Sequence, residues 1–265
     1  MSDQQVLQKL EQYYDAVPRL SARAEDFGPL TLFVRDDGGH PYYARPTPGR
    51  PEPVTVEQVE AVRARQRELG IPESFEWVAE TTPGLKAAVA ESGLQIEECP
   101  LLVLTAEPTL VPETTARILE ADSPALSSAI AVQHLAFATA GTAPGAAGFA
   151  ELAEEIAKVA AADEIARAQG RLRSQATVFA AVIEQEVAVS AGQHNPVGNV
   201  TEIVGVGTLP VARRRGFGAA VTAALAEEAR SRGVETIFLS AADEDVARIY
   251  GRLGFRRVGT AMIVG

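Results

Sequence analysis

Three arginines and two glycines at residues 213–218 have the types and the spacing to bind an anion. The segment is Arg213-x-x-Gly216-x-Gly218, and it lies between a β-branched run and an amphipathic stretch. Glycine lets the backbone approach a ligand without a Cβ atom in the way, and a helix that begins there presents free N–H groups. No carboxylate occupies the first turn, so a phosphate from outside the chain is expected to complete the site. A basic turn before a helix remains the alternative from this pattern alone.

The elements that position this motif follow from periodicity. Apolar residues recur at helical spacing over residues 217–225, which leaves Glu228 on the outer face of the predicted helix. Residues 200–209 are rich in β-branched side chains and predict a strand. Within that strand, Gly205 and Gly207 indicate a bulge or a close approach of another backbone.

A second strand and a second helix follow the motif. Gly233 ends the first helix, residues 236–240 form an apolar strand, and a helix with one apolar face ends at Gly254. Residues 255–264 close the chain as a further extended segment. The predicted order is therefore strand, arginine-rich loop, helix, strand, helix and closing segment.

Two motifs in this order resemble the GNAT N-acetyltransferases, the family related to the Gcn5 histone acetyltransferases. Arg213-x-x-Gly216-x-Gly218 is similar to the family's Q/R-x-x-G-x-G/A loop, and residues 250–255, Tyr-Gly-Arg-Leu-Gly-Phe, resemble its second motif. The resemblance covers roughly residues 124–265 and is strongest after residue 201. It implies an α+β fold with a central mixed, mostly antiparallel twisted sheet flanked by helices, and acetyl-coenzyme A as cosubstrate.

The resemblance also implies which residues bind the coenzyme. In the family, backbone amides of the motif hold the pyrophosphate. Asp243 stands where the family often has a coenzyme-contacting asparagine. The residues expected to bind the coenzyme are Val206, Gly207, Thr208, Arg213, Arg214, Arg215, Gly216, Phe217, Gly218, Ala219 and Asp243.

Acetyl transfer to an amine needs a base for the ammonium and an acid for the departing thiolate. Glu202 is the candidate base, since it stands on the strand that leads to the motif and resembles in position a base glutamate of the histone acetyltransferases. Tyr250 is the candidate acid, because it aligns with a tyrosine that many family members use in this way. An edge-strand carboxylate and a core tyrosine are the structural alternatives.

Two classes of function follow. The first is an acetyltransferase that acts on a primary amine of a small molecule or peptide. The second is a noncatalytic module that binds coenzyme A or an acyl-coenzyme A and acts as a sensor or interaction partner. The presence of both Glu202 and Tyr250 favours the enzyme, and fold-level analogy does not supply the acceptor.

Composition limits the partners. The chain has 265 residues and a net charge of −11; residues 1–123 carry 11 basic and 21 acidic side chains, and residues 124–265 carry 13 and 14. This field opposes nonspecific nucleic acid binding. A single cysteine, Cys99, and the lack of a signal peptide or an apolar run of membrane length predict a cytoplasmic protein without disulfide or membrane contact. His134 and His194 lack metal-ligand spacing, so no metal is expected. A monomer and a homodimer both remain open.

The first half repeats the order of the second. A predicted helix over residues 55–69 ends at Gly70, and a strand and a helix follow up to Gly93, 23 residues later; in the second half Gly233 and Gly254 are 21 residues apart. This predicts two GNAT-like copies in tandem. The first copy is degenerate, because prolines in residues 46–53 remove the N–H donors that a phosphate would need.

The predicted domains are residues 1–105, a linker and first strand over 106–123, and a catalytic domain over 124–265. Ser123-Pro124 predicts a helix start, with the helix running to about residue 138. A loop over 138–148, a helical region over 149–170 and a hairpin tip over 192–198 complete the second half.

Overall fold

The computed structural model describes residues 2–35, 42–50, 52–109, 113–139 and 141–265. Pro51 of the proline-rich loop and residues 110–112 of the predicted linker lie outside the described residues. The chain divides into unit 1, Met1–Leu102 with Ser240–Glu244 and Arg257–Gly265, and unit 2, Val103–Leu239 with Asp245–Arg256. The sequence-based division has its first boundary at residue 105 and keeps the last residues in the catalytic domain, whereas the structure groups Arg257–Gly265 with unit 1.

Unit 1 contains a small sheet with helices on both faces. Its elements are α1 (Asp3–Arg19), β1 (Arg23–Phe27), β2 (Leu30–Val34), β3 (Ala44–Pro46), α2 (Val56–Leu69), β4 (Phe75–Val78), α3 (Leu85–Glu91), most of β5 (Glu97–Leu104) and most of β11 (Phe255–Val264). Strand β11 pairs with β4 in antiparallel register, with Met262 opposite Trp77. The final strand of the chain thus completes the sheet of the first unit.

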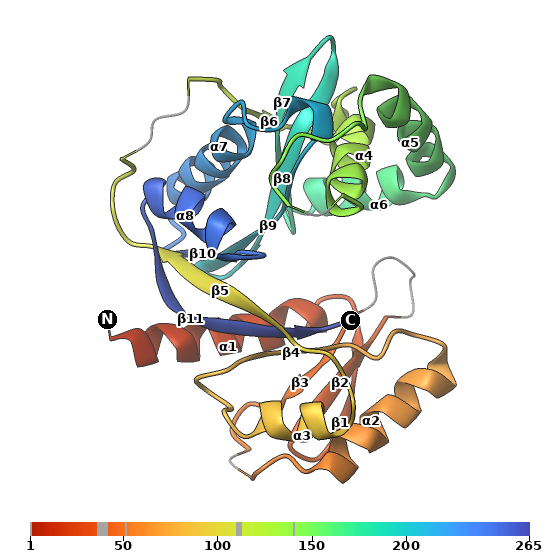
Figure 1. Ribbon diagram of the computed structural model, residues 1–265, viewed down its shortest axis with the longest axis vertical. Coiled ribbons are helices and arrows are strands. Elements are labelled where there is room, and N and C mark those ends of the chain that lie inside the picture. The colour runs from red at the N-terminus through yellow and green to blue at the C-terminus, as the bar shows by residue number, and fades with distance from the viewer. Residues whose placement is uncertain (1, 36–41, 51, 110–112, 140) are drawn as a thin grey trace. The chain divides into compact units, whose positions relative to one another are not determined.

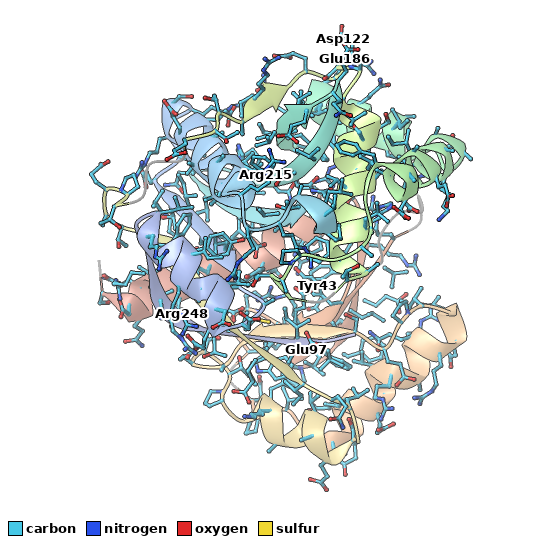
Figure 2. The ribbon with its side chains drawn as sticks, turned by 45° about the horizontal axis from the view of Figure 1, so that its top comes forward. Tyr43, Glu97, Asp122, Glu186, Arg215 and Arg248 are labelled. Carbon is cyan, nitrogen blue, oxygen red and sulfur yellow. The ribbon has the colours of Figure 1, made fainter. Side chains whose placement is uncertain are left out.

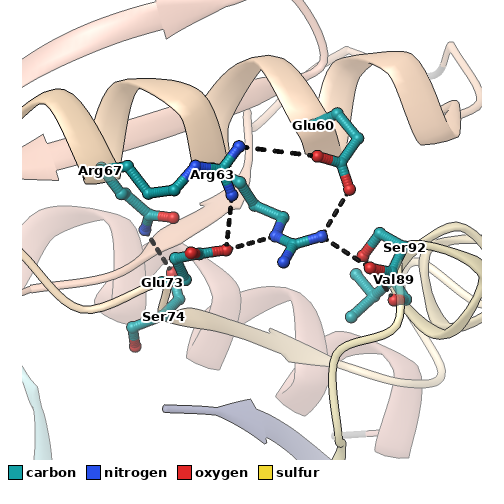
Figure 3. A network of polar contacts seen from close by, with 8 residues as sticks. Glu60, Arg63, Arg67, Glu73, Ser74, Val89 and Ser92 are labelled. Atoms are coloured by element: carbon teal, nitrogen blue, oxygen red, sulfur yellow. Dashed lines mark hydrogen bonds and ion pairs between the residues drawn. The ribbon is translucent and has the colours of Figure 1, made fainter.

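The helix starts and stops of unit 1 follow local signals. Thr55 and Gln58 form a reciprocal capping box at the start of α2, and Gly70 ends the helix in the left-handed conformation. Arg63 of α2 then bonds Glu73 before β4 and, at 2.6 Å, the carbonyl oxygen of Ser92 at the end of α3 (Figure 3). These contacts join the three segments that the repeat predicts in this order.

Unit 2 carries the motif. Its elements are β6 (Arg117–Leu119), α4 (Leu126–Phe137), α5 (Phe149–Ala161), α6 (Glu164–Arg173), β7 (Val178–Glu184), β8 (Val187–Val197), β9 (Val200–Thr208), the short 3₁₀ turn Pro210–Ala212, α7 (Phe217–Ser231), most of β10 (Thr236–Ser240) and most of α8 (Glu244–Arg252). Strands β7, β8 and β9 lie between α7 on one face and α4 on the other (Figure 1).

Strand pairing gives the expected mixed sheet. Within the described residues, eleven strands follow the order β1-β2-β3-β4-β11-β5-β10-β9-β8-β7-β6. The pairs β3–β4 and β9–β10 are parallel, and the hairpins β1–β2 and β7–β8–β9 are antiparallel. The predicted mixed, mostly antiparallel sheet flanked by helices is confirmed.

Two helix predictions are refined by the structure, and one turn prediction is wrong. Helix α4 begins at Leu126 rather than at residue 124, although the hydroxyl of Ser123 accepts from the amide of Ala125 as an N-cap does. The predicted helical region over 149–170 is confirmed as two helices, α5 and α6, between which Asp163 takes a positive φ of 54°. Residues 192–197 belong to β8; the turns lie at 185–186 and 198–199 instead.

None of the helices in the described part of the chain combines the length and the apolarity that a membrane crossing requires. In the same part, His, Cys, Asp and Glu side chains do not gather in threes around a possible metal position.

Candidate active site

A bulge in β9 lies at the centre of the candidate site. Gly205 and Val206 together lie opposite the single residue Gly192 of β8, so β9 carries one extra residue. Gly205 has a φ of +66°, a conformation that side chains with a Cβ atom rarely adopt. A bulge bends the strand and increases its twist. The bulge predicted from the glycines of this strand is therefore confirmed.

Helix α4 packs closely against the bulged part of β9. Nε2 of Gln133 on α4 donates to the carbonyl oxygen of Gly205 at 2.8 Å. A Cβ atom on Gly207 would lie 2.7 Å from the Cβ atom of Ala136, closer than real contacts of this kind. Gly207 is thus the predicted point of close backbone approach.

Side chains on β9 alternate between the α7 face and the α4 face of the strand. Oγ1 of Thr201 lies 2.9 Å from Nδ1 of His194 on β8, and Nε2 of His194 lies 2.6 Å from Oε2 of Glu228 on α7. Because successive strand residues point to opposite faces, Glu202 points to the α4 face. It is half-buried there and lies opposite Asn195 of β8.

Strands β9 and β10 pair over only part of their length. The register runs from Val200 opposite Thr236 to Glu202 opposite Phe238. Strand β9 continues to Thr208, so residues 203–208 extend beyond the described pairing with β10. Glu202 consequently stands at the last described pair of β9 and β10, where the two parallel strands part.

The loop after β9 presents backbone amides for which the described residues offer no acceptor. Gly216 is the N-cap of α7 with a φ of +79°, and the first turn contains neither a capping side chain nor an acidic residue. The amide of Ala220 bonds the carbonyl oxygen of Gly216 at 3.0 Å. For the amides of residues 214–219, the described part of the chain provides no acceptor. We call these amides the cradle.

The three arginines of the motif have different surroundings. Arg213 is buried and donates to carbonyl oxygens, at 2.9 Å in the case of Ala136. Arg215, which is labelled in Figure 2, pairs with Glu184 and lies over the ring of Phe217, 4.4 Å from its centre. The Arg214 side chain is exposed, and it forms no hydrogen bond or ion pair with the described residues. Among the three, Arg214 is therefore the side chain placed to meet an external anion.

Further predicted coenzyme residues line the same region. A Cβ atom on Gly218 would lie 3.6 Å from Oγ1 of Thr208 and 3.7 Å from Cγ1 of Val206. The first turn of α7 therefore packs on the end of β9, with Ala219 buried beside it. Val206, Thr208 and the cradle lie together on the α7 face.

Tyr250 is connected to the cradle through one side chain. Its hydroxyl group is hydrogen-bonded to the hydroxyl of Thr222 on α7, which itself donates to the carbonyl oxygen of Gly218 at 2.9 Å. Tyr250 is 9% exposed, and its burial raises the pKa to about 12 although the bond to Thr222 opposes this shift. The phenol therefore keeps its proton at neutral pH.

Asp243 is exposed in the turn before α8, within the segment Ser240–Glu244 that groups with unit 1. The other predicted coenzyme residues Val206, Thr208 and Gly218, by contrast, lie close to one another within unit 2.

His194 and Glu228 differ from their predicted positions. His194 lies inside β8 and is fully buried, whereas the sequence places it on a hairpin tip. Glu228 points to His194 and does not belong to an outer, solvated face. Burial lowers the pKa of His194, and the hydrogen bond to Glu228 opposes this shift. The sequence has no local signal for this pair, because Gly192 and Pro196 are typical of a turn and Glu228 lies 34 residues away from His194 along the chain.

The corresponding helix of unit 1 lacks a cradle. The hydroxyl of Thr55 accepts from the amide of Gln58, and Glu57 occupies the first turn of α2. An acidic first turn and a filled cap disfavour an anion at this helix. The difference between α2 and α7 agrees with the expected degeneracy of the first copy.

Comparisons with known proteins agree with this geometry. Residues 149–255 match the model of the Acetyltransferase (GNAT) family. A search of curated proteins found no match.

Solved structures resemble the chain over nearly its full length. A GCN5-related N-acetyltransferase from Kribbella flavida has a TM-score of 0.70 at 24% identity, over 98% of this chain and 95% of its own. A GCN5-related N-acetyltransferase from Sphaerobacter thermophilus has a TM-score of 0.53 at 15% identity, over 89% and 80%. A tandem GNAT protein from the clavulanic acid biosynthesis pathway has a TM-score of 0.52 at 15% identity, over 89% and 78%. These likenesses confirm the predicted tandem fold, and the family match identifies residues 149–255 of this chain as part of a GNAT-family acetyltransferase domain.

Proposed function

We propose that unit 2 transfers an acetyl group from acetyl-coenzyme A to a primary amine of a small molecule or peptide. The observation that carries this proposal is the cradle, residues 214–219, at the uncapped start of α7 beside the point where β9 and β10 part. Free amides at a helix N-terminus favour a phosphate group, and the pyrophosphate of coenzyme A supplies two.

The cradle has room for such a group. A Cβ atom on Gly216 would meet no atom within 4 Å, and one on Gly218 would make ordinary contacts only with Thr208 and Val206. Arg214 adds an exposed positive charge beside these amides. Acetyl-coenzyme A, when bound, supplies a thioester as the acetyl donor. Together with the cradle, we assign coenzyme contacts to Val206, Gly207, Thr208, Arg213 through its backbone, and Asp243.

Glu202 is proposed to remove the proton from the substrate ammonium, directly or through a water molecule. An ammonium group must lose a proton before its nitrogen can attack, and a carboxylate at the parting of β9 and β10 is positioned to accept it. Since Glu202 points to the α4 face, the amine approaches from that face of the sheet. The alternative of a solvent-facing edge carboxylate is less suited to a half-buried residue.

Tyr250 is proposed to donate its proton toward the departing thiolate. A phenol with a pKa of about 12 is a hydrogen-bond donor at every pH at which an amine is acetylated. Its hydrogen bond to Thr222, which donates to the carbonyl oxygen of Gly218, supports a role beside the proposed coenzyme site. The two groups would thus act from opposite faces, with the acetyl group between them.

Calorimetry and a thiol-release assay test the proposal. We expect one acetyl-coenzyme A site per chain and release of free thiol with at least one member of a panel of primary amines. Gly218→Glu should weaken binding at least about a hundredfold, because like charges about 4 Å apart repel by about 4 kcal/mol at an effective dielectric constant near 20.

Gly170→Glu is the matched control, since Gly170 is helical and a Cβ atom there meets nothing within 4 Å. Two sites per chain, or a Gly218→Glu variant that binds like wild type, would contradict the cradle. Binding without turnover of any amine would favour the noncatalytic coenzyme-binding module.

A further inference from the structure

The Arg213 side chain points away from the cradle and into the protein. Its guanidinium group donates from Nη2 to the carbonyl oxygens of Ala136 at 2.9 Å and Thr139 at 2.8 Å, and from Nη1 to that of Ala143 at 3.1 Å. Its Nε also approaches the carbonyl oxygen of Thr208, at 3.5 Å. These bonds use four of the five N–H donors of the guanidinium group, and all four acceptors are backbone carbonyl oxygens of the protein.

These carbonyl groups belong to the end of α4 and to the connection that follows it. Helix α4 has no glycine at its C-terminus, since its C-cap is Ala138 in the right-handed conformation. The last carbonyl groups of a helix lack partners within it and carry the negative end of the dipole. Arg213 therefore supplies both the donors and the positive charge that this helix end requires.

Two backbone hydrogen bonds attach the same connection to the motif. The amide of Gly145 donates to the carbonyl oxygen of Pro210 at 3.0 Å, and the amide of Val211 donates to that of Ala147 at 3.1 Å. The α4–α5 connection, by which we mean Thr139 and residues 141–148, is thus held by the turn that immediately precedes the cradle.

This connection lies at the end of the helix that covers the amine side. Gln133 and Ala136 of α4 contact the bulged part of β9, and Glu202 points to the same face. An amine that reaches Glu202 must approach along this face, whereas the cradle amides begin α7 on the other. Arg213 connects the two sides through one guanidinium group.

We propose that Arg213 is a positioning residue that holds the α4–α5 connection in place for the acceptor amine and does not bind the phosphate. The proposal rests on the proposed function for the identity of the acceptor, and its structural part is independent of that function. It assigns adjacent arginines of one motif to different substrates, Arg213 to the amine and Arg214 to the coenzyme.

Three measurements on Arg213→Met and Arg213→Lys test this inference, with Arg230→Met, an exposed arginine of α7, as control. Hydrogen exchange at the Gly145 amide should accelerate at least about tenfold in Arg213→Met, the factor expected when one charge-assisted hydrogen bond is lost. The KM for the amine should rise about tenfold or more, while the Kd of acetyl-coenzyme A changes less than about threefold. Arg213→Lys keeps the positive charge but lacks the planar, forked guanidinium group, so its changes in exchange rate and amine KM should be intermediate.

Each outcome bears on one proposal. Unchanged exchange at Gly145 in both variants, or a Kd for acetyl-coenzyme A that weakens as much as the amine KM rises, would overturn the role of Arg213. Exchange needs no substrate, so it decides the structural part even if no amine reacts. Wild-type protein that neither binds acetyl-coenzyme A nor acetylates an amine would contradict the proposed function instead. If Arg213→Met does not fold, Arg213→Lys gives the same comparison.

Discussion

Replacing Tyr250 with phenylalanine removes one buried hydroxyl group and leaves the ring in place. The hydroxyl bonds Thr222 of α7, and the ring lies 6.1 Å from that of Phe255. If Tyr250 is both a core residue and the proton donor, the substitution should change stability and rate in separable ways.

The effect on stability should depend on pH in a defined direction. Burial raises the pKa of Tyr250 from 10.0 to about 12, so between these values the unfolded chain loses a proton that the folded chain retains. Stability from this group is complete below pH 10 and is lost as the pH rises toward 12. At pH 11 the loss is about 1.4 kcal/mol, since it corresponds to one pH unit above the unfolded pKa.

The Tyr250→Phe variant has no phenol to titrate, so it does not lose stability between pH 10 and 12 in this way, and it also lacks the hydrogen bond to Thr222. At pH 8 we expect the variant to be less stable by about 1 kcal/mol, the usual net contribution of such a bond. At pH 11 the difference should vanish or reverse, because wild type alone loses about 1.4 kcal/mol. Urea unfolding at both pH values measures this, and the other titrating groups are common to both proteins.

The rate should fall by about 10²–10⁴ in kcat/KM, the usual value of a positioned acid, with the Kd of acetyl-coenzyme A nearly unchanged. Thr222→Val is the control, because it removes the partner of the hydroxyl and keeps the phenol; it should lose stability and retain most of the rate. A wild-type rate in Tyr250→Phe would return Tyr250 to a core role. A limb of the wild-type pH–rate profile near pH 9 that disappears in the variant would refute the argument from burial.

Three other substitutions test neighbouring features. Glu202→Gln should lower kcat/KM by about 10²–10⁴ and flatten the acidic limb of the pH–rate profile while coenzyme affinity stays nearly constant, and a wild-type profile would remove Glu202 from the chemistry. Gly207→Ala should destabilise the fold by about 1–3 kcal/mol in urea unfolding, since its Cβ atom would lie 2.7 Å from that of Ala136; an unchanged midpoint would mean that α4 moves freely. Burial lowers the pKa of His194, so the unfolded chain binds the proton first and wild-type stability falls as the pH drops below 6.5. In His194→Gln the free energy of unfolding should therefore decrease less over the same pH range. Parallel wild-type and variant curves between pH 6.5 and 5 would contradict that assignment.

Local features of the fold could be predicted from the sequence because their causes are local. The period of apolar residues after Gly216 predicts α7, and strand β10 has its predicted limits at Thr236 and Ser240. Gly205 and Gly207 predict a bulge and a close approach because glycine alone tolerates both. The turn at Gln185 and Glu186 was missed since both take positive φ without being glycine, so no residue type marked it.

The candidate site divides in the same way between sequence and tertiary structure. Residue types and spacing predict the cradle, because a motif of glycines before a helix has the same backbone consequences wherever it occurs. Glu202 and Tyr250 are candidates through the family resemblance, and their roles stay predictions. The direction of the Arg213 side chain was decided by carbonyl groups 70 to 77 residues away along the chain. Likewise, Glu228 pairs with a buried histidine 34 residues away, although its helical position predicts an outer, solvated side chain. A charged side chain takes its direction from whichever partners the fold brings near it, and no local pattern contains those partners.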